Sequence, residues 1–270
     1  MRTFGLRLDV NCSILLTDLP VTERAAAAAA RGFAGVEFWW PFAAAVPADA
    51  ETDAFVASVL DAGVELVSLN FCAGDMAAGE RGILSHPGRS AEFRENVAAC
   101  AEIAARTGCR RLNAPYGRPV PGVDHDTQDV TALANLRLAA EAASKVGASV
   151  LVEAINSVDA PGFPIDTSAR AMALIERVGA ANVGFLADLY HLAKMGEDVA
   201  DVLSVYRGSI VHVQVADPPG RGAPGTGTLA FEPLFAQLAA QGYDGWVGLE
   251  YEPDGAGGDS FGWLGERAEP

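Results

Sequence analysis

Short apolar runs alternate with longer amphipathic stretches along the whole chain. A glycine ends the stretch before each run, as Gly63 does before VELVSLNF and Gly147 before ASVLVEAIN. Glycine suits this place because it has no Cβ to clash in the left-handed conformation that ends many helices. The same arrangement recurs at Gly32, Gly108, Gly179, Gly208 and Gly242. The runs are rich in Val, Leu, Ile and Phe without strict alternation, which is typical of parallel strands buried on both faces.

With the opening run FGLRLDVN, this pattern predicts eight strands and seven helix-to-strand junctions. The stretches between them read as helices, for example 129–146 and 168–178, with Thr127 and Thr167 as capping residues. Eight strands alternating with helices, without a break in composition, predict an α/β fold, a single (β/α)8 TIM barrel domain over residues 1–270. An open doubly wound sheet is the alternative. It is disfavoured because no strand is followed by a GxGxxG or GxxxxGK[ST] phosphate loop.

Composition and charge narrow the class of protein. No stretch approaches the ~20 apolar residues of a membrane helix, and the first ten residues lack the features of a signal peptide. We therefore expect a soluble cytoplasmic protein with no membrane partner, and association into a homo-oligomer is compatible with the sequence. The net charge of −16 repels phosphate backbones and disfavours a nucleic-acid partner. Four cysteines without a CxxC pair predict free thiols rather than disulfides or a zinc knuckle.

Four metal-competent side chains stand near the ends of the last four predicted strands. They are Glu153 in VLVEAIN, Asp188 in VGFLADLYH, Gln214 in IVHVQVAD and Glu250 in WVGLEYEP. In (β/α)8 barrels the active site lies at the carboxyl ends of the strands, so these four side chains should meet there. Three carboxylates in one barrel mouth repel each other unless a proton or a cation neutralises them. Oxygen ligands of this kind favour Mg²⁺ or Mn²⁺, so the sequence predicts a divalent-metal site.

The chain resembles the hydroxypyruvate isomerase family, within the xylose isomerase-like barrels that also include ketose 3-epimerases. The resemblance runs nearly end to end and is most specific in NFCAGDMAAGERGI, LVEAINSVDAPGF, DLYH, HVQVADPPGRGAPGTG and GYDGWVGLEYEP. It implies that Glu153 and Glu250 are paired acid/base groups and also metal ligands, with Asp188 and Gln214 as the other two ligands. The epimerases usually have a histidine where Gln214 stands, which favours the isomerase branch. The implied reaction interconverts hydroxypyruvate and tartronate semialdehyde through an enediolate.

Further residues are candidates for binding a small hydroxy-oxo acid or sugar. Isomerisation moves a proton between adjacent carbons, so one group must take the proton and another must return it. A substrate carboxylate also needs a cation, for which Arg221 in the PPGR loop and Arg81 in the GERG loop are candidates. The resemblance implies that His191 hydrogen-bonds a substrate oxygen. Asn70 and Asn113 end the third and fourth strands and are candidates for lining the pocket.

Other functions known for such barrels fit this sequence less well or stay open. A Schiff-base aldolase needs a lysine inside a strand, but Lys145 and Lys194 both lie outside the predicted strands. An apurinic-site endonuclease needs a histidine-rich zinc cluster and a basic groove, which four histidines and the acidic charge argue against. A barrel that only binds a sugar is disfavoured because all four predicted ligands are present. A 2-oxo-tetronate isomerase or a ketose 3-epimerase would keep the same metal and glutamates, so both stay open.

Overall fold

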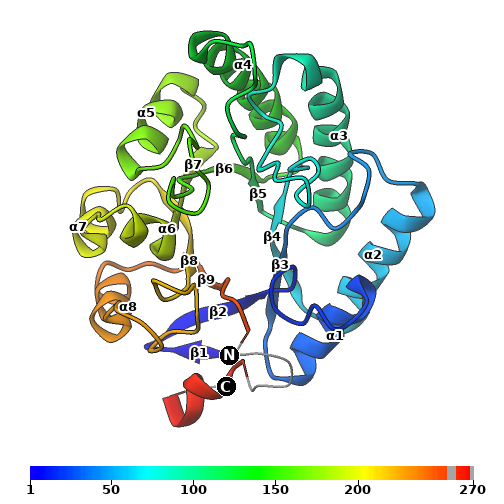
Figure 1. Ribbon diagram of the computed structural model, residues 1–270. Coiled ribbons are helices and arrows are strands. Elements are labelled where there is room, and N and C mark those ends of the chain that lie inside the picture. Colours follow the sequence, from blue (N-terminus) through cyan, green and yellow to red (C-terminus); the bar gives the residue numbers. More distant parts are fainter. Residues whose placement is uncertain (254–259, 268–270) are drawn as a thin grey trace.

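The computed structural model describes residues 1–253 and 260–267 and confirms the closed barrel (Figure 1). Closure arises because β2 (Leu6–Asn11) pairs in parallel with both β3 (Gly35–Phe38) and β9 (Trp246–Leu249). An open doubly wound sheet is therefore excluded. The remaining parallel strands are β4 (Glu65–Asn70), β5 (Arg111–Asn113), β6 (Ser149–Glu153), β7 (Val183–Asp188) and β8 (Ile210–Val215).

Helices surround the strands in chain order (Figure 1). Each buries an apolar stripe against the barrel, as α5 does with Ala171, Leu174 and Val178 at helical spacing. Within the described residues, none of these helices is long and apolar enough to cross a membrane. The helices are α1 (Val21–Ala30), α2 (Asp49–Ala62), α3 (Ser90–Thr107), α4 (His125–Lys145), α5 (Ser168–Val178), α6 (Leu189–Lys194), α7 (Val199–Val205) and α8 (Phe231–Ala240).

One of the two predicted helix caps is correct and the other is wrong. The Thr167 hydroxyl accepts a hydrogen bond from the backbone N–H of Arg170 over 3.4 Å and caps α5, as predicted. The prediction for Thr127 is wrong, because α4 begins earlier, directly after Asp124. The carboxylate of Asp124 accepts the backbone N–H of Thr127 over 2.8 Å. Aspartate caps helices at least as well as threonine, and it comes first along the chain.

Three local features add to the predicted barrel. A two-residue strand, β1 (Arg2–Thr3), pairs antiparallel with the start of β2 and was not predicted. The helix after β7 begins directly at Leu189, so His191 lies in a first helical turn rather than at a strand end. A 3₁₀ segment, η2 (Gly262–Arg267), follows the barrel near the end of the chain, and residues 254–259 lie outside the described residues.

A row of inward-facing residues crosses four neighbouring strands below the barrel mouth. Asp188 is in register with Gln214, Gln214 with Gly248, and Gly248 with Asp9. Residues in register on parallel strands point to the same face of the sheet. The three side chains are buried in the barrel interior, and Gly248 leaves a gap between them. Glu37 of β3 fills this gap, since a Cβ on Gly248 would lie 2.7 Å from its Oε1 atom.

Candidate active site

A cavity of roughly 250 Å³ lies at the carboxyl ends of the strands, where the sequence predicted the site. Six of the nine predicted site residues line it, and three do not. The six are Glu153, Glu250, His191, Arg221, Arg81 and Asn70. The other three, Asp188, Gln214 and Asn113, are buried.

Two of the predicted ligands, Glu153 and Asp188, form a compact group with His191. Nε2 of His191 lies 3.5 Å from Oδ2 of Asp188 and 3.7 Å from Oε1 of Glu153. One ligand atom of each residue lies within 4.8 Å of the other two, a spacing that could hold a metal ion. The Asn113 amide donates a hydrogen bond to Oε2 of Glu153 over 2.8 Å. Asn113 therefore orients the Glu153 carboxylate rather than lining the cavity.

Burial and mutual repulsion disfavour negative charge on these carboxylates. Burial, reinforced by the charge of Asp188, raises the pKa of Glu153 to about 8. Burial also raises the pKa of Glu250 well above its ordinary value, although the guanidinium of Arg221 opposes the shift. Both glutamates therefore favour a bound proton or a nearby cation. Acids perturbed in this way, in a cleft, are typical of proton-transfer sites and metal sites.

Five buried side-chain oxygen atoms have no hydrogen-bond partner among the described residues: three belong to Asp9 and Asn113, and two belong to predicted metal ligands. The latter two are Oδ2 of Asp188 and Oε1 of Gln214, which stand in register on neighbouring strands. The other carboxylate oxygen of Asp188 accepts the backbone N–H of Tyr190 over 2.9 Å. A buried acceptor without a partner costs about 1–3 kcal/mol. Because carboxylate and amide oxygens are the ligands that hard divalent cations prefer, these residues fit such a cation.

His191 presents a hydrogen-bond donor to the cavity. Its Nδ1 atom accepts the backbone N–H of Asn156 over 3.3 Å. Burial lowers the pKa of His191 to about 4, so the imidazole is neutral and carries its single proton on Nε2. A protonated ring nitrogen donates hydrogen bonds and does not coordinate a metal. His191 therefore suits contact with a substrate oxygen better than a place among the ligands.

Glu250 lies in the same cavity but has partners of its own. Nη2 of Arg221 donates to Oε1 of Glu250 over 2.7 Å, and Nε1 of Trp39 donates to the same oxygen over 3.1 Å. The guanidinium of Arg221 also lies over the ring of Tyr190, 5.4 Å from its centre. The loop that carries Arg221 is held by the carboxylate of Asp217, which accepts three backbone N–H groups farther along it. Arg221 is thus a fixed partner of Glu250.

Arg81 is the other predicted cation at the cavity. Its Nη1 atom donates to the backbone oxygens of Met76 and Glu80 over 3.0 and 2.7 Å. Among the described residues no carboxylate forms an ion pair with Arg81. Burial and the positive charges of Arg118 and Arg221 lower its pKa, which marks a local excess of positive charge. This part of the cavity therefore favours an anionic group.

Glu37 is a site residue that the sequence analysis missed. It is 1% exposed, and its carboxylate accepts the side-chain amide of Gln214 over 2.7 Å. A single glutamate inside the apolar run GVEFWW is the signal that could have revealed it. A charged side chain in a buried strand is rare unless it has partners or a function.

Comparison with known proteins places the chain among sugar and oxo-acid isomerases. Residues 25–267 match the xylose isomerase-like TIM barrel family. The chain is 50% identical to a protein of Streptomyces coelicolor provisionally named a hydroxypyruvate isomerase, covering 97% of each chain. It is 35% identical to the hydroxypyruvate isomerase of Escherichia coli, covering 96% of this chain and 98% of the relative. It is also 37% identical to the 2-oxo-tetronate isomerase of Cupriavidus necator, covering 96% and 97%.

A solved structure supports the fold over the same length. A Brucella melitensis protein described as a family 2 AP endonuclease superposes with a TM-score of 0.87 at 36% identity. The match covers 96% of this chain and 98% of that one. Its barrel therefore corresponds to this one nearly end to end.

Proposed function

The chain belongs to the hydroxypyruvate isomerase family of xylose isomerase-like TIM barrels, and from this premise we propose that it interconverts hydroxypyruvate and tartronate semialdehyde. The observation that carries the proposal is that Glu153 and Glu250, both buried, line one small cavity. The reaction removes a proton from C3 of hydroxypyruvate and delivers a proton to C2. Two acid/base groups at one substrate meet this need.

The perturbed acidity of the two glutamates suits their paired roles. One must act as a carboxylate and the other as a carboxylic acid in the same turnover. An ordinary glutamate is almost fully ionised near neutral pH, whereas the raised pKa of Glu153, about 8 with no cation bound, leaves both forms available there. Asn113 holds one oxygen of Glu153, and Arg221 with Trp39 holds one oxygen of Glu250. These hydrogen bonds fix the orientation of the two carboxyl groups.

We also propose that Glu153, Asp188, Gln214 and Glu250 hold a divalent cation, Mg²⁺ or Mn²⁺. The unpartnered oxygens of Asp188 and Gln214 support this ligand set. When bound, such a cation stabilises the negative charge that develops on the two neighbouring substrate oxygens. His191 adds an Nε2–H donor for one of those oxygens.

The cavity favours a short acid over a neutral sugar. Arg81 has donors at the cavity and no carboxylate partner among the described residues, so a substrate carboxylate would pair with it. A neutral ketose would leave that cation unmatched, which argues against a 3-epimerase. Asn70 lines the same cavity and offers an amide to the substrate hydroxyl groups. The second candidate is a 2-oxo-tetronate isomerase, because the C. necator relative carries that name and the chemistry is the same.

A nucleic-acid substrate fits this chain less well than a small acid. The description of the Brucella neighbour raises the possibility, but the net charge of −16 repels a phosphate backbone. An apurinic-site endonuclease needs a histidine-rich zinc cluster. Each of the groups in the described residues that could hold a metal contains a single histidine. We further propose that the enzyme works in the cytoplasm, since its four cysteines are free and buried, as suits a reducing compartment.

Proton NMR of the purified protein with hydroxypyruvate in D₂O tests the proposal. With Mn²⁺ or Mg²⁺ we expect tartronate semialdehyde to appear, and we expect EDTA or Glu153→Gln to abolish the conversion. Glu65→Gln is the matched control, because Glu65 starts β4 at the opposite end of the barrel and should leave turnover intact. Turnover of 2-oxo-tetronate but not hydroxypyruvate would overturn the substrate assignment. Turnover that survives metal removal would overturn the metal.

A further inference from the structure

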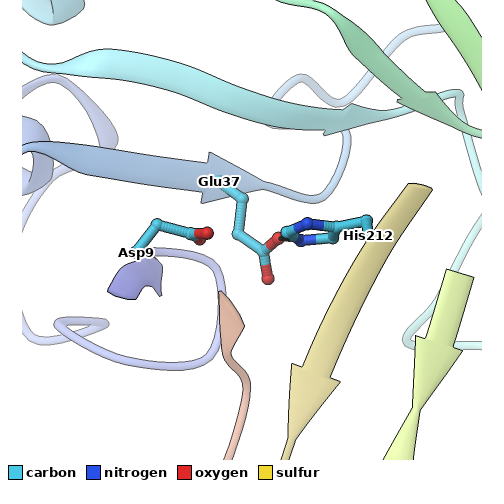
Figure 2. Close-up of side chains that lie close together, drawn as sticks. All are labelled: Asp9, Glu37 and His212. Carbon is cyan, nitrogen blue, oxygen red and sulfur yellow. Dashed lines mark hydrogen bonds and ion pairs between the residues drawn. The ribbon is translucent and has the colours of Figure 1, made fainter. Parts of the chain in front are cut away.

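The buried carboxylate of Glu37 lies in the barrel interior (Figure 2). Figure 2 shows Glu37 reaching from β3 to a position between the carboxylate of Asp9 and the ring of His212. Glu37 does not line the cavity, so it is placed to act on the substrate only through other residues. Its contact with Gln214 on β8 points to Gln214 as the residue through which it acts.

Three nitrogen groups surround the Glu37 carboxylate. Oε1 accepts the side-chain amides of Asn11 over 3.0 Å and Gln214 over 2.7 Å, and Oε2 lies 2.7 Å from Nε2 of His212. The orientation of Asn11 is set independently, because its amide oxygen accepts the backbone N–H of Ser13 over 3.0 Å. Asn11 and His212 therefore hold the Glu37 carboxylate in place independently of its contact with Gln214.

We infer that Glu37 is a positioning residue that turns the Gln214 amide so that its carbonyl oxygen faces the metal ligands. A carboxylate only accepts hydrogen bonds, so the end of the amide that faces Glu37 is the NH₂ group. The other end, Oε1, then points away from Glu37 and is a buried oxygen without a hydrogen-bond partner. In the reverse orientation the amide would offer N–H donors, which cannot coordinate a cation. The inference rests on the proposed metal site. It adds that Glu37 determines which atom of the Gln214 amide faces the cation.

The backbone of β9 makes room for this contact. Gly248 lies in register with Gln214, and a Cβ there would approach all three carboxyl atoms of Glu37, from 2.7 to 2.9 Å. Only the absence of a side chain on Gly248 lets the Glu37 carboxylate reach the amide. The neighbouring Asp188, in register on the other side, also carries a buried oxygen without a hydrogen-bond partner. The two free oxygens thus stand on adjacent strands, as two ligands of one cation would.

Manganese binding to matched variants, measured by the EPR signal of free Mn²⁺, tests the inference. Glu37→Leu removes the anchor and should weaken Mn²⁺ binding about 10- to 100-fold, as loss of a group that orients a ligand typically does. Adding Gln214→Glu to Glu37→Leu should restore most of the affinity, because a carboxylate presents an oxygen in either orientation. Glu37→Gln is the conservative control and should bind nearly as the wild type does. Its amide oxygen can still accept from Gln214, and the unpartnered Nδ1 of His212 lets that ring change tautomer.

Each outcome of these titrations either supports or overturns the positioning role of Glu37. Wild-type affinity in Glu37→Leu would overturn the inference, and so would a loss that Gln214→Glu fails to reverse, because the role would then not be orientation. If Glu37→Leu does not fold, as judged by circular dichroism, Gly248→Ala provides the same test with Glu37 retained but displaced. Failure of the wild-type protein to bind Mn²⁺ would instead overturn the proposed metal site, and this inference with it.

Discussion

The backbone N–H of Asn156 donates a hydrogen bond to Nδ1 of His191, 3.3 Å away, and this contact decides where the imidazole carries its proton. A backbone N–H has no lone pair to offer, so Nδ1 is the acceptor. With the pKa of His191 lowered to about 4 by burial, the ring stays neutral near pH 7. The proton on Nε2 then faces the carboxylates of Asp188 and Glu153.

We therefore expect His191→Ala to impair turnover without weakening metal binding. Loss of one hydrogen bond to a substrate oxygen that develops charge should lower kcat/KM by roughly 10- to 100-fold. Mn²⁺ affinity should stay at the wild-type value, whereas Asp188→Ala should lower it strongly. EPR titration together with steady-state kinetics separates the two effects. An equal loss of affinity in both variants would make His191 a ligand and the tautomer argument wrong.

Without metal, the stability of the protein should decline as the pH rises through neutrality. The pKa of Glu153 is raised in the folded state to about 8, so the fold holds this proton more tightly than the unfolded chain does. Its stabilisation is complete below the ordinary pKa of about 4.5 and is lost as the pH rises through about 8. The raised pKa of Glu250 acts in the same direction. Calorimetry in EDTA between about pH 5 and pH 9 should show this decline.

Glu153→Gln is the control for this pH dependence. A glutamine cannot ionise, so the decline should be shallower in this variant. Mn²⁺ should also raise the unfolding temperature of the wild-type protein more at about pH 8 than at about pH 6, because protons compete with the cation for the carboxylates. Identical slopes in the two proteins would show that Glu153 does not titrate in this range.

Arg221 should stabilise the fold chiefly by neutralising Glu250. Arg221→Met leaves that carboxylate buried with Trp39 as its remaining hydrogen-bond donor. Breaking a fully buried ion pair costs roughly 3–5 kcal/mol, and the 22% exposure of the Arg221 side chain should reduce this to about 2 kcal/mol. Urea denaturation in EDTA measures the change. In the double variant with Glu250→Gln we expect most of the stability to return. If the losses of unfolding free energy in the two single variants simply add in the double variant, the two residues do not act as a pair.

The barrel was predictable because its signals are local. A glycine followed by an apolar run marks each helix-to-strand junction in sequence, and Gly63, Gly108 and Gly179 do end helices in the left-handed conformation. The positions of Glu153 and Asp188 at strand ends followed from the same pattern. Once eight strands are placed, their carboxyl ends must share one mouth.

The partners of these residues could not be predicted in the same way. Asn113 contacts Glu153 from a neighbouring strand, and Glu37 reaches Gln214 across the gap at Gly248. Both contacts depend on the stagger between strands, which no single segment of sequence encodes. The pairing of Arg221 with Glu250 depends likewise on the path of a loop.

The gap at Gly248 gives a last prediction, on stability and metal affinity together. In Gly248→Ala the new methyl group must displace the Glu37 carboxylate, which three nitrogen groups hold in place, and overpacking of this kind costs about 1–3 kcal/mol. Gly208→Ala is the matched control, since a Cβ there meets nothing within 4 Å and should change stability by less than about 0.5 kcal/mol.

Mn²⁺ affinity should fall in Gly248→Ala and stay unchanged in Gly208→Ala. If Gly248 is needed only for packing, Gly248→Ala should lower stability and leave the Mn²⁺ affinity unchanged. Unfolding curves and EPR titrations of the two variants therefore distinguish a packing role from the one argued here. If Gly248→Ala is destabilised but binds Mn²⁺ as tightly as the wild type, the orientation of Gln214 does not depend on the place of Glu37. If stability and affinity fall together, the missing side chain on β9 is part of what builds the metal site.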